Sequence, residues 1–332
     1  MTVYLFRRFL YMVMLVWVVS LVSFAIIQLP AGDYVDRLRL EYIARGEELE
    51  QEDLDNLRFR FGLDQPAFVQ YLSWAGNILQ GELGWSFSHE QPVAKVIGDR
   101  IGLTVAISVI TLLFTYLLAI PIGIYSATHQ YSIADYIAMF VGFLGRAIPN
   151  FLLALILIYF FLNIGAGKSV GGLFSKDFVR APWSVAKFID FLKHLPLPIF
   201  IIGTAATAGL IRTMRATLLD ELGRQYVITA RAKGLHETRL VLKYPVRVAL
   251  NPMASTIGWL LPEIVSGSVI TAMVLNLPTV GPRLFSALLA EDMFLASSLL
   301  FFLTALTVIG TFISDMALVI VDPRIRFTER ET

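Results

Sequence analysis

The sequence contains no cysteine and few charged residues. Without cysteine, the chain can form neither disulfide bonds nor a thiolate metal site, and it has no cysteine nucleophile. Lys, Arg, Asp and Glu make up 16% of the 332 residues, against roughly 25% in an average soluble domain. The 4 histidines are scattered and form no His-Glu-x-x-His pattern. We therefore expect no zinc site, no Ser-His-Asp triad and no nucleic-acid interface.

What the sequence has instead is apolar residues, which account for 56% of it. They are collected into long runs, and such runs are typical of a chain that is solvated by lipid. The first run, Phe9–Leu29, holds no charge. A helix rises 1.5 Å per residue, so this run can cross a hydrocarbon core about 30 Å thick. A cleaved signal peptide would have a shorter apolar core and a small-residue cleavage site, so an uncleaved helix is the better interpretation.

Five further runs follow along the chain. They are Ile101–Ala127, Tyr136–Leu162, Leu195–Ile211 with an extension past Arg212 toward Leu219, Asn251–Leu275 and Phe294–Ile320. Pro121, Pro149 and Pro262 lie inside these runs, and membrane helices tolerate proline where neighbouring groups satisfy the freed carbonyls. The sequence thus predicts an all-α integral membrane protein with six transmembrane helices.

Charge sets the predicted orientation of these helices. Residues 212–247 hold eight basic and three acidic side chains, whereas residues 30–100 hold seven basic and thirteen acidic ones. The positive-inside rule places the first segment in the cytoplasm and the second outside. Six helices then leave both termini cytoplasmic, with Arg7 and Arg8 at the start and Arg324, Arg326 and Arg330 at the end.

The same runs divide the chain into parts. We expect a cytoplasmic start and first transmembrane helix at residues 1–29, and an external cap at 30–100. The membrane core follows at 101–320, and a cytoplasmic tail at 321–332. In the cap, Asp64 is expected to begin a helix with Pro66 in its first turn. Helical spacing would then put an apolar face against the membrane or the helix bundle, formed by Phe68, Tyr71, Leu72, Ala75 and Leu79.

One short segment superficially resembles a phosphate-binding loop. It is Gly165-Ala166-Gly167-Lys168-Ser169, but the full pattern needs a glycine at the position of Leu162 and a buried strand before the loop. The predicted topology also places this segment outside the cell, away from ATP. Any energy from ATP must therefore come through another chain.

The basic cytoplasmic segment, residues 219–250, contains a distinctive short helix and turn. Ala230, Ala232 and Lys233 favour a helix, and Gly234 suits the left-handed residue just past a helix end. Small alanine side chains would let the backbone approach a partner closely. From these features alone, a docking element and an ordinary basic loop both remain open.

The motif in this segment resembles the coupling loop of ABC importer permeases, in the form used by the dipeptide/oligopeptide/nickel group. It reads Thr229-Ala230-Arg231-Ala232-Lys233-Gly234-Leu235. Further matches to that group are Gly62-Leu63-Asp64-Gln65-Pro66, Gly81-Glu82-Leu83-Gly84-Trp85-Ser86 and, at the carboxyl end, Asp322-Pro323-Arg324-Ile325-Arg326. The sequence departs from the group at Ile228, where the broader motif has glutamate, and at Pro278-Thr279-Val280-Gly281.

The resemblance implies a type I ABC importer permease in the bacterial inner membrane. It implies four kinds of partner: a second homologous permease chain, two cytoplasmic ATP-binding subunits, an external solute-binding protein and the lipid bilayer. ATP and Mg would bind the partner ATPase subunits, so this chain is expected to be no enzyme and to bind no cofactor or metal. The imported solute would be a di- or oligopeptide, with oligosaccharide or nickel as alternatives.

Three charges lie inside the predicted transmembrane helices. Arg146 and Glu263 are the deepest, and either could line the solute pathway or hold the bundle together by pairing with each other or with the second permease. Asp315 lies near the cytoplasmic end, where a structural role is the better interpretation. A secondary transporter driven by an ion gradient is the main alternative of another class, because it would need no ATPase partner. A membrane enzyme is disfavoured by the missing catalytic residues.

Overall fold

The computed structural model describes residues 2–28, 34–44, 46, 50–164, 171–266 and 269–321. The chain forms two compact units. The core unit comprises residues 105–278 and the chain from 309 onward, and the N-terminal unit comprises residues 2–104 and 279–308. The glycine-rich segment 165–170 and the carboxyl-terminal motif 322–326 lie outside the described residues.

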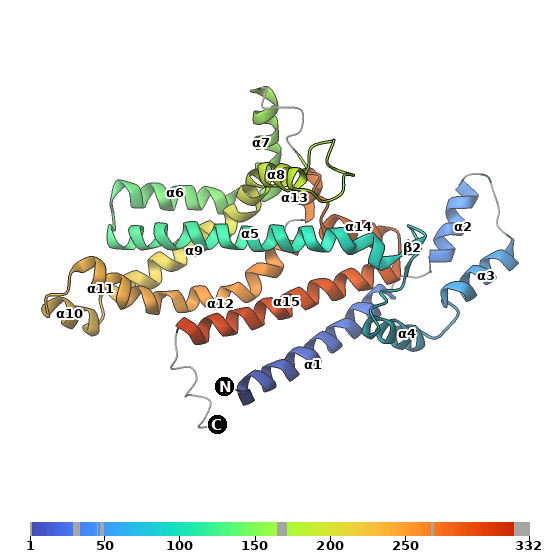
Figure 1. The fold of residues 1–332 in the computed structure, drawn as a ribbon, viewed down its shortest axis with the longest axis horizontal. Helices are drawn as coiled ribbons and strands as arrows, with labels where there is room; N and C mark the ends of the chain where they lie inside the picture. Colours follow the sequence, from blue (N-terminus) through green and yellow to red (C-terminus); the bar gives the residue numbers. More distant parts are fainter. Residues whose placement is uncertain are drawn as a thin grey trace. The chain divides into compact units, whose positions relative to one another are not determined.

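In its described part, the core unit has only helices as regular secondary structure, joined by turns and loops (Figure 1). Its elements are the second part of α5 (Val93–Thr128), α6 (Ile133–Ala147), α7 (Asn150–Asn163), α8 (Val185–His194), α9 (Pro196–Leu222), α10 (Gln225–Ala232), α11 (Glu237–Lys243), α12 (Pro245–Ser266), α13 (Val269–Val274) and the second part of α15 (Met293–Val321).

Three of the described helices are long and apolar enough to cross a membrane by themselves: α5, α9 and α15. The pair α6 and α7 meets the same criterion as a bent unit. Helix α9 continues through Arg212 to Leu222, as the sequence predicted. Helix α5 begins at Val93, earlier than the predicted start at Ile101, and Pro121 lies inside it.

The helix predicted over Tyr136–Leu162 is broken into two. Helix α6 ends at Ala147, α7 begins at Asn150, and the two axes meet at 102°. Pro149 causes the break, since proline removes a backbone donor and disfavours the helical conformation of the residue before it. Ile148 accordingly has ψ 122 and Pro149 has ψ 136. Pro149 is therefore not tolerated within a helix, in contrast to Pro121.

Small residues bring the core helices together. A Cβ added at Gly123 would lie 2.6 Å from the Met214 side chain, and one at Gly145 would lie 2.7 Å from Thr204. A Cβ at Gly258 in α12 would lie 3.1 Å from the backbone of Thr311 in α15. Such close approach is typical of helices that associate in membranes, where packing replaces the hydrophobic effect.

The N-terminal unit combines helices with one short hairpin. Its elements are α1 (Thr2–Ile27), α2 (Tyr34–Ala44), α3 (Gln51–Phe61), α4 (Ala67–Leu79), β1 (Trp85–Ser86), β2 (Gln91–Pro92), α14 (Val280–Leu289) and the first parts of α5 and α15. The strands are antiparallel, with Trp85 opposite Pro92 and Ser86 opposite Gln91. Sequence analysis did not predict this hairpin, because its strands have only two residues each.

Helix α4 packs in this unit with part of the predicted face, Tyr71 and Ala75, and with Trp74, which the prediction left out. Tyr71 and Trp74 are buried, while Phe68 and Leu72 are exposed. Trp74 has a larger apolar side chain than Phe68 or Leu72. Its indole also donates a hydrogen bond to Ser298 Oγ at 3.4 Å. The helix start predicted at Asp64 is wrong, because α4 begins at Ala67 with Pro66 at the N-cap position and no side-chain N-cap hydrogen bond.

The loop between β1 and β2 is held by a buried carboxylate. Asp292 is fully buried and accepts hydrogen bonds from Ser86 Oγ at 2.6 Å and from Ser88 Oγ at 2.8 Å. Beside it, Arg283 Nη1 lies 2.5 Å from His89 Nε2. Burial and the charge of Arg283 lower the pKa of His89 below its ordinary value. The imidazole is thus held neutral at neutral pH, and its Nε2 can accept a hydrogen bond from the guanidinium of Arg283.

Candidate functional site: the cytoplasmic coupling segment

The predicted coupling loop folds into two short helices, α10 and α11, which connect α9 to α12 (Figure 1). We call residues 225–243 the coupling segment. Gly234 follows the end of α10 with φ +77, as the sequence predicted. Its N–H donates to Arg231 O at 3.0 Å, and the N–H of Leu235 donates to Ala230 O at 3.4 Å. This pair of bonds is the Schellman motif, which satisfies the last carbonyls of a helix.

One face of the coupling segment is packed into the core unit. Val227 and Leu240 are fully buried, and Ala230 and Val241 are also buried. They belong to one apolar cluster with residues of α9 and α12, including Met214. Because these side chains are buried in one apolar cluster, we expect a displacement of α10 or α11 to move the ends of α9 and α12 as well.

The opposite face of α10 is exposed. It presents Ile228, Thr229, Ala232 and Lys233, which we call the docking face. Ile228 and Ala232 are separated by one helical turn and therefore lie side by side. Ile228 is 48% exposed, so the residue that replaces the usual glutamate contributes an apolar contact surface.

The structure corrects the role predicted for Ala230. This residue is buried against the core unit and cannot approach a partner, whereas Ala232 can. Leu235 is half-buried and packs against the same apolar cluster. Of the seven predicted coupling residues, five remain accessible: Thr229, Arg231, Ala232, Lys233 and Gly234. Periodicity alone could have separated Val227 and Ala230 from Ile228 and Ala232.

An exposed ion pair spans the turn at Gly234. Arg231 Nε donates to Glu237 Oε2 at 3.0 Å, and Arg231 Nη2 donates to Oε1 at 2.5 Å. The guanidinium lowers the pKa of Glu237 below its ordinary value. Arg231 thus links α10 to α11 by an ion pair that is exposed to water.

A second ion pair, which sequence analysis missed, lies next to the coupling segment. Asp135 at the start of α6 is 2% exposed, and it accepts from Arg215 Nε and Nη2 of α9 at 2.8 Å each. Ser126 of α5 and the backbone N–H of Tyr131 also donate to it. Asp135 thus ties three helices together. Its position in the first turn of a helix after a polar loop gave no sign of a partner eighty residues away.

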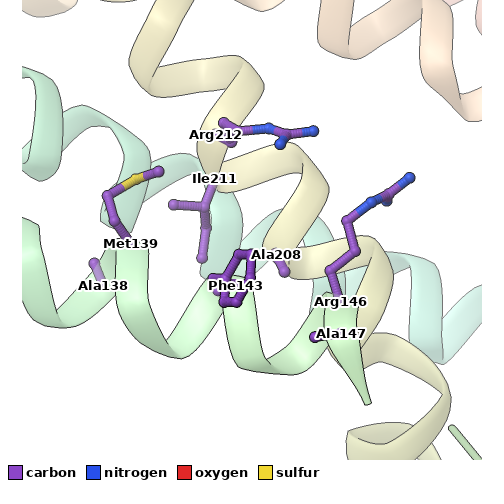
Figure 2. Close-up of a pocket in the computed structure, with 9 residues that line it drawn as sticks. Ala138, Met139, Phe143, Arg146, Ala147, Ala208, Ile211 and Arg212 are labelled. Atoms are coloured by element: carbon purple, nitrogen blue, oxygen red, sulfur yellow. The ribbon is translucent and has the colours of Figure 1, made fainter. Parts of the chain in front are cut away.

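The three charges predicted inside the transmembrane helices lie in different surroundings. Within the described residues, Arg146 and Glu263 form no ion pair with each other, and both are exposed in this chain. Asp315 is half-buried in α15. Arg146 lines a cavity together with Arg212, a residue that sequence analysis treated only as the end of an apolar run (Figure 2).

No group of three or more His, Asp or Glu side chains lies close enough to hold a metal ion in the part of the chain that the structure describes. The coupling segment thus combines a buried inner face, an exposed outer face and a glycine turn between two short helices.

The chain is similar to known transport proteins over most of its length. A family model described as the inner membrane component of binding-protein-dependent transport systems matches residues 119–327. A second model, for the N-terminal part of such components, matches residues 1–108. The oligopeptide transport system permease protein AppB of Bacillus subtilis (strain 168) is 32% identical over 329 residues, which cover 98% of this chain and all of AppB.

A solved structure shares the fold. The MetNI methionine ABC transporter, in an inward-facing conformation, has a chain that matches with a TM-score of 0.51 and 17% sequence identity. The match covers 68% of the present chain and 96% of that one. At this identity, the likeness concerns the fold alone.

Proposed function

Because the chain belongs to the family of binding-protein-dependent transport system inner membrane components, we propose that it forms half of the membrane pore of an ATP-driven peptide importer. A second homologous permease chain would form the other half. Two ATP-binding subunits would dock on the cytoplasmic side, and an external binding protein would deliver the solute. The observation that most strongly supports this proposal is the coupling segment, with one buried and one exposed face.

The proposed mechanism is alternating access. ATP binding would draw the two ATPase subunits together and move the docking faces, and hydrolysis would release them. The buried face, around Val227 and Leu240, would pass this movement to α9 and α12. Nucleotide can drive such a cycle only through unequal affinity for the inward-facing and outward-facing states.

The proposed topology has six transmembrane helices, both termini in the cytoplasm and an external cap between the first two. Its support comes from the charge bias of residues 212–247 and from the long apolar helices α5, α9 and α15. Helices α1, α12 and the bent pair α6–α7 would complete the count. In this arrangement the coupling segment faces the ATPase subunits.

A di- or oligopeptide is the proposed solute, because AppB is named as an oligopeptide permease and aligns over its whole length. An oligosaccharide or nickel would use the same machinery and remains the alternative. A secondary transporter would differ in kind, since it would move solute without ATPase subunits.

Reconstitution into liposomes tests this proposal. We expect radiolabelled trialanine to accumulate only when the permease pair, the ATPase subunits, the binding protein and ATP are all present. Omitting the ATPase subunits should abolish accumulation, because no other part of the complex would supply energy. Accumulation driven by an ion gradient in their absence would contradict the proposal.

A further inference from the structure

Helices α6 and α9 line a partly open cavity of about 320 Å³ in the core unit (Figure 2). Its walls are mainly apolar and include Met139, Phe143 and Ile211, and its polar side chains are Arg146 and Arg212. Small-molecule sites typically have this size and this combination of apolar walls with a few polar groups. Neither the family match nor the relatives assign a role to this cavity.

Both arginines lack an ion-pair partner within the described residues. The contrast with Arg215 is informative, because Arg215 lies one turn farther along α9 and is fully paired with Asp135. Helix α9 therefore carries two kinds of guanidinium. Arg215 ties helices together, whereas Arg212 lines a cavity. The second kind is available to a ligand.

The side chain of Arg146, which starts on α6, reaches the backbone of α9. Its Nη1 lies 3.4 Å from the position that a Cβ would occupy at Gly209, so the side chain rests over bare backbone. Charged residues within transmembrane helices are costly and face a partner charge or a water-filled cavity. Since both arginines line one cavity, a single anionic ligand can satisfy both.

We propose that Arg146 and Arg212 bind the carboxyl-terminal carboxylate of the peptide during its passage through the permease. This inference rests on the proposed function, since it identifies the solute group that the pore contacts. A guanidinium matches a carboxylate in both charge and geometry. Every linear peptide has this group whatever its side chains, so one contact would serve many peptides.

The same chemistry distinguishes among the alternative solutes. Two cationic side chains would repel Ni²⁺ and would gain no charge interaction from a neutral oligosaccharide. The apolar walls formed by Met139, Phe143 and Ile211 would instead accommodate the last side chain of a peptide. Peptide is therefore the solute that the cavity complements in both charge and apolarity.

Direct binding tests the inference. The purified complex of both permeases and both ATPase subunits, without binding protein, is titrated with radiolabelled trialanine and with trialanine amide. We expect the wild-type complex to bind the free acid about tenfold more tightly than the amide, because only the acid can form charge-assisted hydrogen bonds. Arg146→Gln and Arg212→Gln should each remove most of this preference and leave affinity for the amide unchanged.

Arg180→Gln is the matched control, because Arg180 is exposed in the loop before α8 and lines none of this cavity. It should keep the full preference. The inference is overturned if the wild-type complex does not discriminate between the two peptides, including by binding neither. It is also overturned if both cavity variants keep the preference, or if they lose the second permease on purification, since the arginines would then hold the assembly together.

Failure of the inference can be told apart from failure of the proposed function. Trialanine uptake by the wild-type complex in liposomes is measured first. If there is no uptake, the proposed function fails. If uptake is normal while Arg146→Gln and Arg212→Gln retain the preference for the free acid, only the assignment of the two arginines fails.

Discussion

Replacing Gly234 with valine is expected to lower ATP-driven peptide uptake about tenfold while ATP hydrolysis continues. Gly234 has φ +77, a conformation that costs an L-residue roughly 1–2 kcal/mol and a β-branched residue more. A free-energy cost of this size lowers the population of molecules with the native turn between α10 and α11 about tenfold. Uptake and phosphate release, both measured in the same liposomes, give the coupling ratio.

The cause of this effect can be isolated with matched variants. A Cβ at Gly234 would meet no atom within 4 Å, so backbone strain rather than a clash is responsible. Gly234→Asn should retain coupling, because asparagine tolerates the left-handed region. Gly223→Val should also retain it, because Gly223 has φ −83 at the end of α9. Equal loss in Gly223→Val and Gly234→Val would contradict the explanation.

Breaking the Asp135–Arg215 pair is expected to produce the largest loss of stability. Asp135→Ala leaves Arg215 without its carboxylate, and removing one partner of a buried ion pair costs about 3–5 kcal/mol. We expect a value near the lower end, because the Arg215 side chain keeps 19% exposure. Thermal unfolding of the purified complex in detergent measures the change.

A double variant distinguishes two causes of the lost stability: the missing ion-pair contact and the guanidinium that is left without a partner. Asp135→Ala with Arg215→Met should be more stable than Asp135→Ala alone, because no unpaired guanidinium remains. Glu237→Ala breaks the exposed pair with Arg231 and should have little effect, since water and salt screen that pair. If Asp135→Ala and Glu237→Ala had equal effects, the three-helix tie would not stabilise the core unit.

Local sequence rules predicted the centre of the site. Glycine after an alanine-rich helix leads to a left-handed turn, and Gly234 adopts it. Such a feature depends on a few neighbouring residues, so the sequence contains all the information that it needs. Long apolar runs similarly predicted α5, α9 and α15.

Features that depend on tertiary context were missed. The hydropathy of Tyr136–Leu162 is continuous across Pro149, so composition could not show that α6 and α7 meet at 102°. Proline is compatible with both a kinked and a broken helix, and the neighbouring packing decides between them. The packing of Trp74 in α4 was missed for a related reason, because its hydrogen-bond partner Ser298 lies far along the chain.

Ion pairs between residues far apart in the chain could not be predicted from the sequence either. Asp135 and Arg215 lie eighty residues apart, and neither belongs to a recognisable motif. Arg146 was identified as unusual from its place in an apolar run. The sequence could not show, however, that its companion at the cavity is Arg212 rather than Glu263.

The central claim is that the docking face contacts an ATP-binding subunit, and cross-linking tests it most directly. Because the chain has no cysteine, Ala232→Cys gives it a single thiol, which is labelled with a benzophenone maleimide on the purified chain before the complex is assembled. Val185→Cys, at a site on α8 that is 78% exposed, is the control on the face proposed to be external. We predict that irradiation joins the probe at position 232, and not the probe at position 185, to the ATP-binding subunit. The absence of that product at position 232, or its formation from position 185, would contradict the account.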